Sequence, residues 1–190
     1  QLTLYVSTQH PDGNQREAAA ALNLGTHDVE VICRRMGGGF GGKEGNASIF
    51  SQSAALAAFK LKRPVKLRAN RDDDMMITGK RHDFRIDYDV GFDDTGRIAG
   101  LDVTLASRCG YSVDFSGPVN DRAVLHIDNC YQLPNLLVTS HRCKTHMQSA
   151  TAFRGFGGPQ GMFGIETVIE AIAKHLGKDP LDVRRANLYR

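Results

Sequence analysis

The sequence lacks the features of a membrane, secreted or nucleic-acid-binding protein. No apolar stretch approaches the ~18 residues that a membrane span needs, and no basic-then-apolar leader opens the chain. The net charge is only +3 and no basic run is long enough to form a patch, which disfavours nucleic acid as a partner. The four cysteines show no CxxC spacing, so we expect reduced thiols in a cytoplasmic protein, although spacing alone leaves disulfides open.

The features that are present indicate a globular piece of a longer protein. Hydrophobic residues make up 41% and charged residues 24% of the chain, as in an ordinary globular domain. The length of 190 residues suits one large domain or two smaller ones, and we expect any boundary near residues 60–80. Because the chain opens directly on an apolar alternation at Gln1, without a methionine, we expect residues 1–190 to be a fragment.

Strand and helix patterns are mixed without strict alternation, which predicts an α+β fold. The clearest signal is a hairpin, in which apolar and polar residues alternate on both sides of a turn at residues 93–96. Residues 110–129 are predicted to be irregular, and 72–74 to form a solvated strand end. Strands are expected at 2–8, 29–33, 64–68, 85–92, 101–105 and 136–139, and helices at about 13–24, 47–61, 160–176 and from 180 onward.

A glycine-rich loop between a predicted strand and a predicted helix is the most informative local feature. Five glycines surround Phe40 between Gly37 and Gly42, which leaves backbone N–H groups free to approach a ligand closely. The helix that follows favours an anionic group at its N-terminus. A flexible turn or a tight packing site is the alternative, and it accounts less well for five glycines in six residues.

The same loop partly fits a phosphate-binding P-loop. Residues 37–43 match G-x-x-x-x-G-K after a strand and before a helix. The motif then fails, because Glu44 stands where serine or threonine would bind Mg²⁺, and its carboxylate would repel phosphate. A P-loop-like nucleotide-binding module is therefore a remote alternative.

A second glycine-rich loop, residues 154–159, makes the same argument independently. Arg154 can donate a planar pair of hydrogen bonds to an oxyanion, and the ring of Phe156 can face a flat ligand, with a core aromatic as the alternative. His141, Cys143 and His146 resemble a metal cluster but lack a second pair of ligands. We therefore expect no metal to be bound directly by protein side chains.

These segments together resemble the molybdenum hydroxylases, and within that family the members that oxidise purines. The resemblance covers essentially the whole chain, in order and with family-like spacing. It implies that the chain is a fragment of the domain that binds the molybdenum cofactor, molybdenum-molybdopterin. It rests on residues 7–9, 36–44, 77–79, 121–123, 128–131 and 151–160.

The resemblance assigns the cofactor contacts to four residues. Gln9 matches a glutamine that hydrogen-bonds an oxygen ligand of molybdenum. Phe40 and Gly41 match residues whose backbone approaches the cofactor, and Arg154 matches an arginine on the cofactor side. All four are therefore expected to lie beside molybdopterin in the complete enzyme.

The resemblance also assigns the substrate contacts. Glu44 and Arg122 match the acidic and basic residues that orient the purine and stabilise the charge that develops on it. Phe156 matches one of two rings that enclose the substrate, and Phe115 lies where the family more often has an aliphatic residue at the entrance. Aldehyde oxidases of this family typically have apolar residues at the positions of Glu44 and Arg122. The pair therefore favours a purine, with an aldehyde or another heterocycle as the alternative substrate.

The reaction implied by the resemblance is hydroxylation of a heterocycle carbon, from hypoxanthine or xanthine to urate, with water as the source of oxygen. A glutamate further along the chain is the general base of the family, and the second enclosing ring also lies there. FAD, 2Fe–2S clusters and the NAD that accepts electrons belong to other regions or subunits. The complete enzyme is expected to be a dimer.

We expect the purified 190-residue chain to hold no stoichiometric molybdenum and to lack hydroxylase activity, because the resemblance gives it only part of the cofactor cradle. Elemental analysis and a hypoxanthine assay of the purified chain check this expectation. Stoichiometric molybdenum would show that these residues suffice to hold the cofactor.

Overall fold

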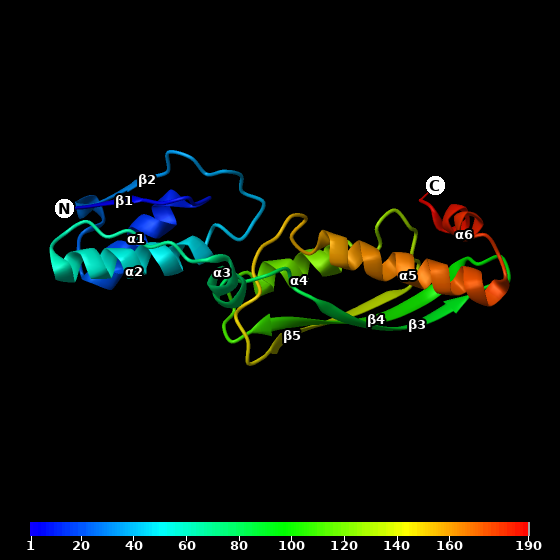
Figure 1. The fold of residues 1–190 in the computed structure, drawn as a ribbon. Helices are drawn as coiled ribbons and strands as arrows, with labels where there is room; N and C mark the ends of the chain where they lie inside the picture. Colours follow the sequence, from blue (N-terminus) through cyan, green and yellow to red (C-terminus); the bar gives the residue numbers. More distant parts are fainter. Residues whose placement is uncertain (190) are drawn as a thin grey trace. The chain divides into compact units, whose positions relative to one another are not determined.

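The computed structural model describes residues 1–189 and divides the chain into two compact units, Gln1–Lys80 and Arg81–Arg190. Each unit mixes helices with strands, which confirms the predicted α+β class (Figure 1). Within the described residues, no helix combines the length and the apolar character that crossing a bilayer requires.

The first unit is built on a parallel pair of strands joined by a helix. Strand β1 (Leu2–Tyr5) pairs with β2 (Val29–Ile32), and helix α1 (Pro11–Leu22) and the short 3-10 helix η1 (Thr26–Asp28) connect them. Parallel neighbours need such a crossover, because a tight turn cannot bring the second strand back in the same direction. The predicted strands and the alanine-rich helix are confirmed, although β1 ends at Tyr5.

Three alanines in the core of this unit, Ala18, Ala19 and Ala55, let its helices approach closely. Helix α2 (Asn46–Leu61) packs on α1, and Ala55 is buried against it. The short helix α3 (Arg71–Ile77) follows. The buried core residues are Leu4, Ala18, Ala19, Leu22, Val29 and Ala55.

Two predictions in this unit are wrong. Residues 64–68 lie outside the strands of the described chain, because an apolar alternation becomes a strand only where a neighbouring edge pairs with it. Asp72–Asp74 form the first turn of helix α3 rather than a strand end, and Asn70 Oδ1 caps that helix by accepting the Asp73 amide at 2.8 Å. Three carboxylates at a helix N-terminus are favourable, since the helix dipole is positive there.

The second unit contains a three-stranded sheet in the order β3-β4-β5. Strands β3 (Phe84–Phe92) and β4 (Ile98–Gly110) form the predicted hairpin. Its turn is held by Asp93 Oδ1, which accepts the Thr95 amide at 2.8 Å. Strand β5 (Leu136–Lys144) runs parallel to β4, which the sequence pattern did not predict.

Two helices cover one face of this sheet. Helix α5 (Gly158–Leu176) lies along the sheet beside α4 (Ser116–Leu125), as Figure 1 shows. Its predicted apolar stripe is confirmed as the centre of the core, with strand β4 contributing the facing side chains. The largest members are Ile98, Leu105, Ile127, Tyr131, Ile165, Ile169 and Ile172.

The prediction of an irregular stretch over 110–129 is wrong, because it contains α4. Gly117 and Pro118 obscure the helix in the sequence, but both lie in its first turn, where a proline leaves no intrahelical bond unmade. Glycines of α5 and the preceding loop let α4 approach backbone to backbone. A Cβ atom at Gly157 would collide with the carbonyl oxygen of Val119, and one at Gly161 with that of Ala123.

Helix α6 (Pro180–Asn187) closes the far end of the second unit through two buried side chains, the apolar Val183 and the polar Asn187. Asn187 Oδ1 accepts the Ile98 amide at 2.8 Å, and its Nδ2 donates to Gly96 O at 2.8 Å and to Val183 O at 2.9 Å. One side-chain amide therefore pairs backbone groups of the turn, of the start of β4 and of helix α6.

Replacing Asn187 by alanine should lower the free energy of unfolding by about 1–3 kcal/mol, because it leaves buried backbone groups unpaired. Asn135→Ala is the control, since Asn135 makes one exposed bond to Ala99 O and its loss should cost less than about 1 kcal/mol. Urea unfolding of both variants measures the difference. Equal losses would contradict this account.

Candidate functional site

The first glycine loop is held by the segment that follows β1. The backbone N–H of Gln9 donates to Lys43 O at 3.0 Å, and Thr8 Oγ1 donates to the same oxygen at 2.8 Å. The Gly41 amide donates to Gln9 Oε1 at 3.1 Å. Gln9 therefore orients the loop through its acceptor oxygen and keeps its side-chain N–H₂ available as a donor.

Lys43 closes the base of the loop. Its ammonium donates to Met36 O at 2.5 Å and to Ser7 Oγ at 3.0 Å. In a P-loop the lysine reaches the β- and γ-phosphates. Here the lysine is instead bound to the carbonyl of Met36, immediately before the loop. The structure therefore argues further against a P-loop than the sequence does.

The glycines give this loop a conformation that side chains would not permit. Gly37, Gly38, Gly41 and Gly42 all have φ between +72° and +99°. A Cβ atom at Gly39 would lie 2.6 Å from Gln9 Cγ, so bare backbone is required there as well. Phe40, at the centre of the loop, is 63% exposed. The loop is thus a cradle of exposed backbone, which fits a cofactor that approaches main-chain atoms closely.

Unpartnered polar groups collect at the start of helix α2, directly after this loop. Within the described chain, Glu44 Oε2, Asn46 Nδ2 and Ser48 Oγ are buried without a hydrogen-bond partner. Buried polar groups in native proteins are nearly always paired, so several such groups in five residues indicate a site that is completed by something bound. The sequence predicted Glu44 but missed Asn46 and Ser48, for which the only signal was their position in a helix N-terminus.

The second glycine loop, in the second unit, carries a strained aromatic residue. Phe156 has φ +52°, between Gly155 at +90° and Gly157 at +101°. A bulky side chain in the left-handed region costs about 1–3 kcal/mol and is retained where the surroundings or the function require it. Holding the Phe156 ring in this position therefore costs backbone strain, which packing of an ordinary core aromatic does not require.

The predicted substrate residues of the second unit lie close together. The rings of Phe115 and Phe156 meet edge to face, with centroids 5.8 Å apart and planes 66° apart. Phe115 is the residue that precedes α4, and the exposed Arg122 lies on the same helix. A Cβ atom at Gly158, the first residue of α5, would lie 3.7 Å from Arg122 Nε. The ring of Phe115 and the side chain of Arg122 thus lie next to the second glycine loop, at Phe156 and at Gly158 respectively.

The eight predicted site residues therefore fall into two groups, one in each unit. Arg154 belongs to the second group, where its side chain is exposed and its carbonyl accepts from Arg81 Nη2 at 2.8 Å. The first unit contributes Gln9, Phe40, Gly41 and Glu44, and the second contributes Phe115, Arg122, Arg154 and Phe156.

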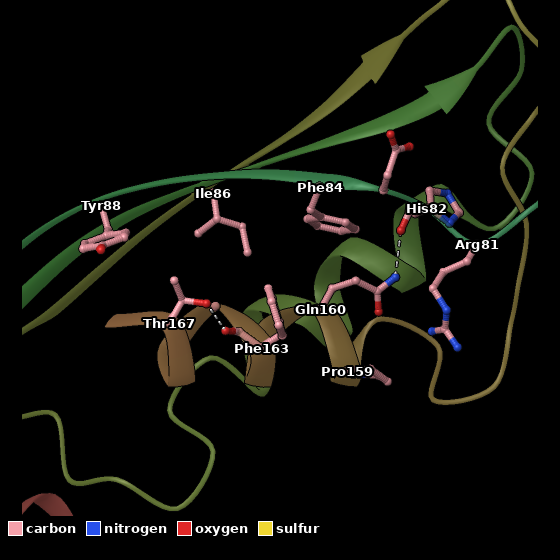
Figure 2. Close-up of a pocket in the computed structure, with 11 residues that line it drawn as sticks. Arg81, His82, Phe84, Ile86, Tyr88, Pro159, Gln160, Phe163 and Thr167 are labelled. Carbon is pink, nitrogen blue, oxygen red and sulfur yellow. Dashed lines mark hydrogen bonds between the residues drawn. The ribbon is translucent and has the colours of Figure 1, made fainter. Parts of the chain in front are cut away.

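A separate cavity of about 470 Å³ lies between strand β3 and helix α5 (Figure 2). None of the eight predicted site residues lines it. Phe84, Ile86 and Phe163 give it apolar walls, and Arg81 and Gln160 lie at one end.

A buried histidine follows Arg81 and was missed by the sequence reasoning. His82 is 1% exposed, and its Nε2 lies 2.7 Å from Ser116 Oγ, at the start of α4. Burial lowers the pKa of His82 below its ordinary value of 6.5. A lone histidine before a strand carries no spacing signal that could have revealed this contact.

The structure holds no disulfide and no cluster of potential metal ligands within residues 1–189. All four cysteines are free thiols. No group of three or more histidine, cysteine or acidic residues could hold a metal ion in this part of the chain.

Comparison with known proteins gives one consistent result. Residues 1–188 match the family model described as molybdopterin cofactor-binding domain. The chain is 46% identical over 190 residues to a xanthine dehydrogenase of Drosophila subobscura, covering all of this chain and 14% of that protein. It is 42% identical over 188 residues to a nicotinate hydroxylase of Emericella nidulans, covering 99% of this chain and 14% of that one.

A solved structure agrees with these sequence relatives. The aldehyde oxidoreductase of Desulfovibrio gigas superimposes with a TM-score of 0.86 at 26% identity, covering 99% of this chain and 20% of that one. The chain thus spans about one seventh of the length of the curated relatives it matches.

The buried His82 should make the second unit sensitive to acid. Because its folded pKa lies below its unfolded pKa, its contribution to stability is complete above about pH 6.5 and is lost as the pH falls through that value toward the folded pKa. We expect the free energy of unfolding to fall less between about pH 7 and pH 5 in His82→Gln than in the wild type. His141→Gln, at an exposed site in the same unit, is the control and should keep the wild-type pH profile. Identical profiles for all three proteins would disprove the assignment.

Proposed function

Because the chain belongs to the molybdopterin cofactor-binding domain family, we propose that it forms part of the active site of a xanthine dehydrogenase-type molybdenum hydroxylase. The proposed reaction oxidises hypoxanthine and xanthine to urate and takes its oxygen from water. The observation that carries the substrate assignment is the ring pair of Phe115 and Phe156, together with the exposed Arg122 on the helix that follows Phe115. Two aromatic rings suit a flat heterocycle, and a cation suits one that becomes negatively charged during the reaction.

Molybdenum-molybdopterin is the proposed cofactor, and the first glycine loop fits it. Gln9, Phe40, Gly41 and Arg154 are the residues proposed to contact it. The Gln9 side-chain N–H₂ is left free to donate, because its oxygen already accepts from Gly41. When bound, this cofactor would supply the metal chemistry of the reaction, which is activation of water and uptake of the substrate's electrons. The polypeptide binds and orients the two reactants.

Arg122 is proposed to stabilise negative charge on the purine. Attack on a ring carbon moves electron density onto the ring nitrogens and exocyclic oxygen, so a guanidinium contact strengthens toward the transition state. Glu44 is proposed to hold a ring N–H or to share a proton with a ring nitrogen. Its Oε2 atom has no partner within the described chain, which leaves it free for this contact.

The rest of the enzyme is proposed to lie outside this chain, which spans only 14% of its xanthine dehydrogenase relative. The general base, the second enclosing ring, FAD, the 2Fe–2S clusters and the site where NAD accepts electrons are assigned to those other regions or subunits. We propose a dimeric enzyme in the cytoplasm, and the four free cysteines are consistent with a reducing compartment.

A second candidate function is hydroxylation of another heterocycle or of an aldehyde. The 42% identity to a nicotinate hydroxylase and the structural likeness to an aldehyde oxidoreductase support it. Glu44 and Arg122 favour the purine, since a simple aldehyde offers neither a ring nitrogen nor a delocalised charge. Relative turnover of hypoxanthine, nicotinate and an aromatic aldehyde by the complete enzyme decides between the candidates.

Replacing Arg122 by methionine should slow purine turnover by the complete enzyme roughly 10- to 100-fold, because a charge-assisted hydrogen bond contributes about 1.5–3 kcal/mol. An aromatic aldehyde makes no such contact and should be turned over at close to the wild-type rate. Steady-state kinetics on both substrates measure the effect. Arg85→Met removes an exposed, ion-paired arginine from the same unit and should change neither rate. Equal losses on both substrates would mean that Arg122 is structural.

Glu44→Val should also reduce purine turnover, as Arg122→Met does, because it removes the proposed contact with a ring nitrogen. The effects of the two substitutions are not expected to add, because both residues hold one substrate. Unchanged hypoxanthine kinetics in Glu44→Val would remove Glu44 from the proposed substrate contacts.

A further inference from the structure

Two adjacent residues at the start of the second unit contact three separate segments that surround the ring pair. Arg81 reaches the second glycine loop, and His82 reaches both the start of α4 and the start of α5. Neither residue is among the eight site residues, and neither has an assigned role in the proposed reaction. Their contacts converge on the backbone that carries Phe115 and Phe156.

Arg81 holds the glycine loop by two different interactions. Its Nη2 donates to Arg154 O at 2.8 Å, and its guanidinium carbon lies 4.4 Å from the centre of the Phe153 ring. The carbonyl that it binds lies only two residues before Phe156. A planar guanidinium can donate in its plane and stack on a ring with its face at the same time, which an ammonium cannot do.

His82 holds the starts of α4 and α5, which adjoin Phe115 and Phe156. Its Nε2 hydrogen-bonds Ser116 Oγ at 2.7 Å, directly after Phe115, and its carbonyl oxygen accepts from Gln160 Nε2 at 3.1 Å. Figure 2 shows this second bond at the N-terminal end of α5, with the Arg81 side chain extending beside it. The imidazole is buried, so its position is fixed by packing as well as by hydrogen bonds.

We propose that Arg81 and His82 are positioning residues that set the orientation of Phe156 relative to Phe115, and through it the binding of a flat substrate. Phe156 needs such support because its left-handed backbone is unfavourable and its two neighbours are glycines. The Phe156 amide makes a bond to Phe153 O at 2.8 Å, within the same short loop. The contacts of Arg81 with Phe153 and Arg154 therefore hold the turn that gives Phe156 its position.

Hydrogen–deuterium exchange of the complete protein tests the positioning role without reference to activity. Removing a charge-assisted hydrogen bond should raise exchange of the loop amides at 153–158 by about tenfold in Arg81→Met. Arg81→Lys keeps the charge but loses the planar fork, and should give an intermediate increase. Arg85→Met is the matched control, because it removes an exposed arginine from the neighbouring strand and should leave the loop unchanged. His82→Phe keeps an aromatic ring but loses the bond to Ser116, and should raise exchange around 113–118.

The proposal is overturned if the loop amides exchange no faster in Arg81→Met and Arg81→Lys than they do in Arg85→Met. A melting temperature measured for each variant identifies one that fails to fold. If Arg81→Met does so, the comparison of Arg81→Lys with Arg85→Met decides the question alone.

The substrate part of the inference rests on the proposed function and is tested separately by kinetics. A misplaced ring weakens contacts that are made equally in the ground state and the transition state, so Arg81→Lys should raise KM for hypoxanthine severalfold with kcat little changed. This result differs from the loss of kcat expected for Arg122→Met. A wild-type enzyme that does not oxidise hypoxanthine rejects the proposed function, whereas the exchange result still decides the positioning role. The link to substrate binding is overturned by a different result. In that case the wild-type enzyme oxidises hypoxanthine, and Arg81→Lys shows raised loop exchange but an unchanged KM.

Discussion

The hydrogen bonds between the segment after β1 and the first glycine loop are the constraint on which the shape of that loop depends. A stretch of five glycines has almost no side-chain packing to hold its shape and loses much conformational entropy on ordering. Thr8 and Gln9 offset that loss by binding Gly41 and Lys43 at the C-terminal end of the loop, and Lys43 donates to Met36 O at its start. The loop can present bare backbone because its neighbours supply all the fixing contacts.

The second glycine loop is also held in place, but by different interactions. This loop carries an aromatic residue in a conformation that favours glycine, so strain is added to flexibility at Phe156. Helix α5 begins immediately afterwards, and its apolar stripe is buried against β4. The burial of that stripe stabilises the whole second unit and anchors the end of the loop, while polar contacts from Arg81 and His82 fix its detail.

Elements that alternate or repeat in the sequence were predictable, and elements that depend on distant partners were not. The β3–β4 hairpin and the stripe on α5 follow from local periodicity. Helix α4 was missed because glycine and proline in its first turn imitate a loop, and the parallel pairing of β5 depends on a partner 35 residues earlier, since Leu136 pairs with Leu101.

The candidate site shows the same division. Its eight residues were assigned by the family resemblance, and all but Phe115 lie in the short contiguous stretches of sequence that carry it. The contacts that fix them join residues as far apart as Arg81 and Arg154, which are 73 positions apart, and no spacing rule connects such a pair. Asn46 and Ser48 look like ordinary helix residues until their burial and missing partners are seen.

The close backbone contact between α4 and α5 has a consequence for how the exposed residues of α4 can vary. Gly157 and Gly161 lock the scaffold through main-chain atoms of Val119 and Ala123, which no substitution on α4 alters. Arg122 lies between those two positions in sequence but is exposed rather than buried in the contact. A substitution at Arg122 can therefore change the charge exposed on α4 while the two helices keep their registration.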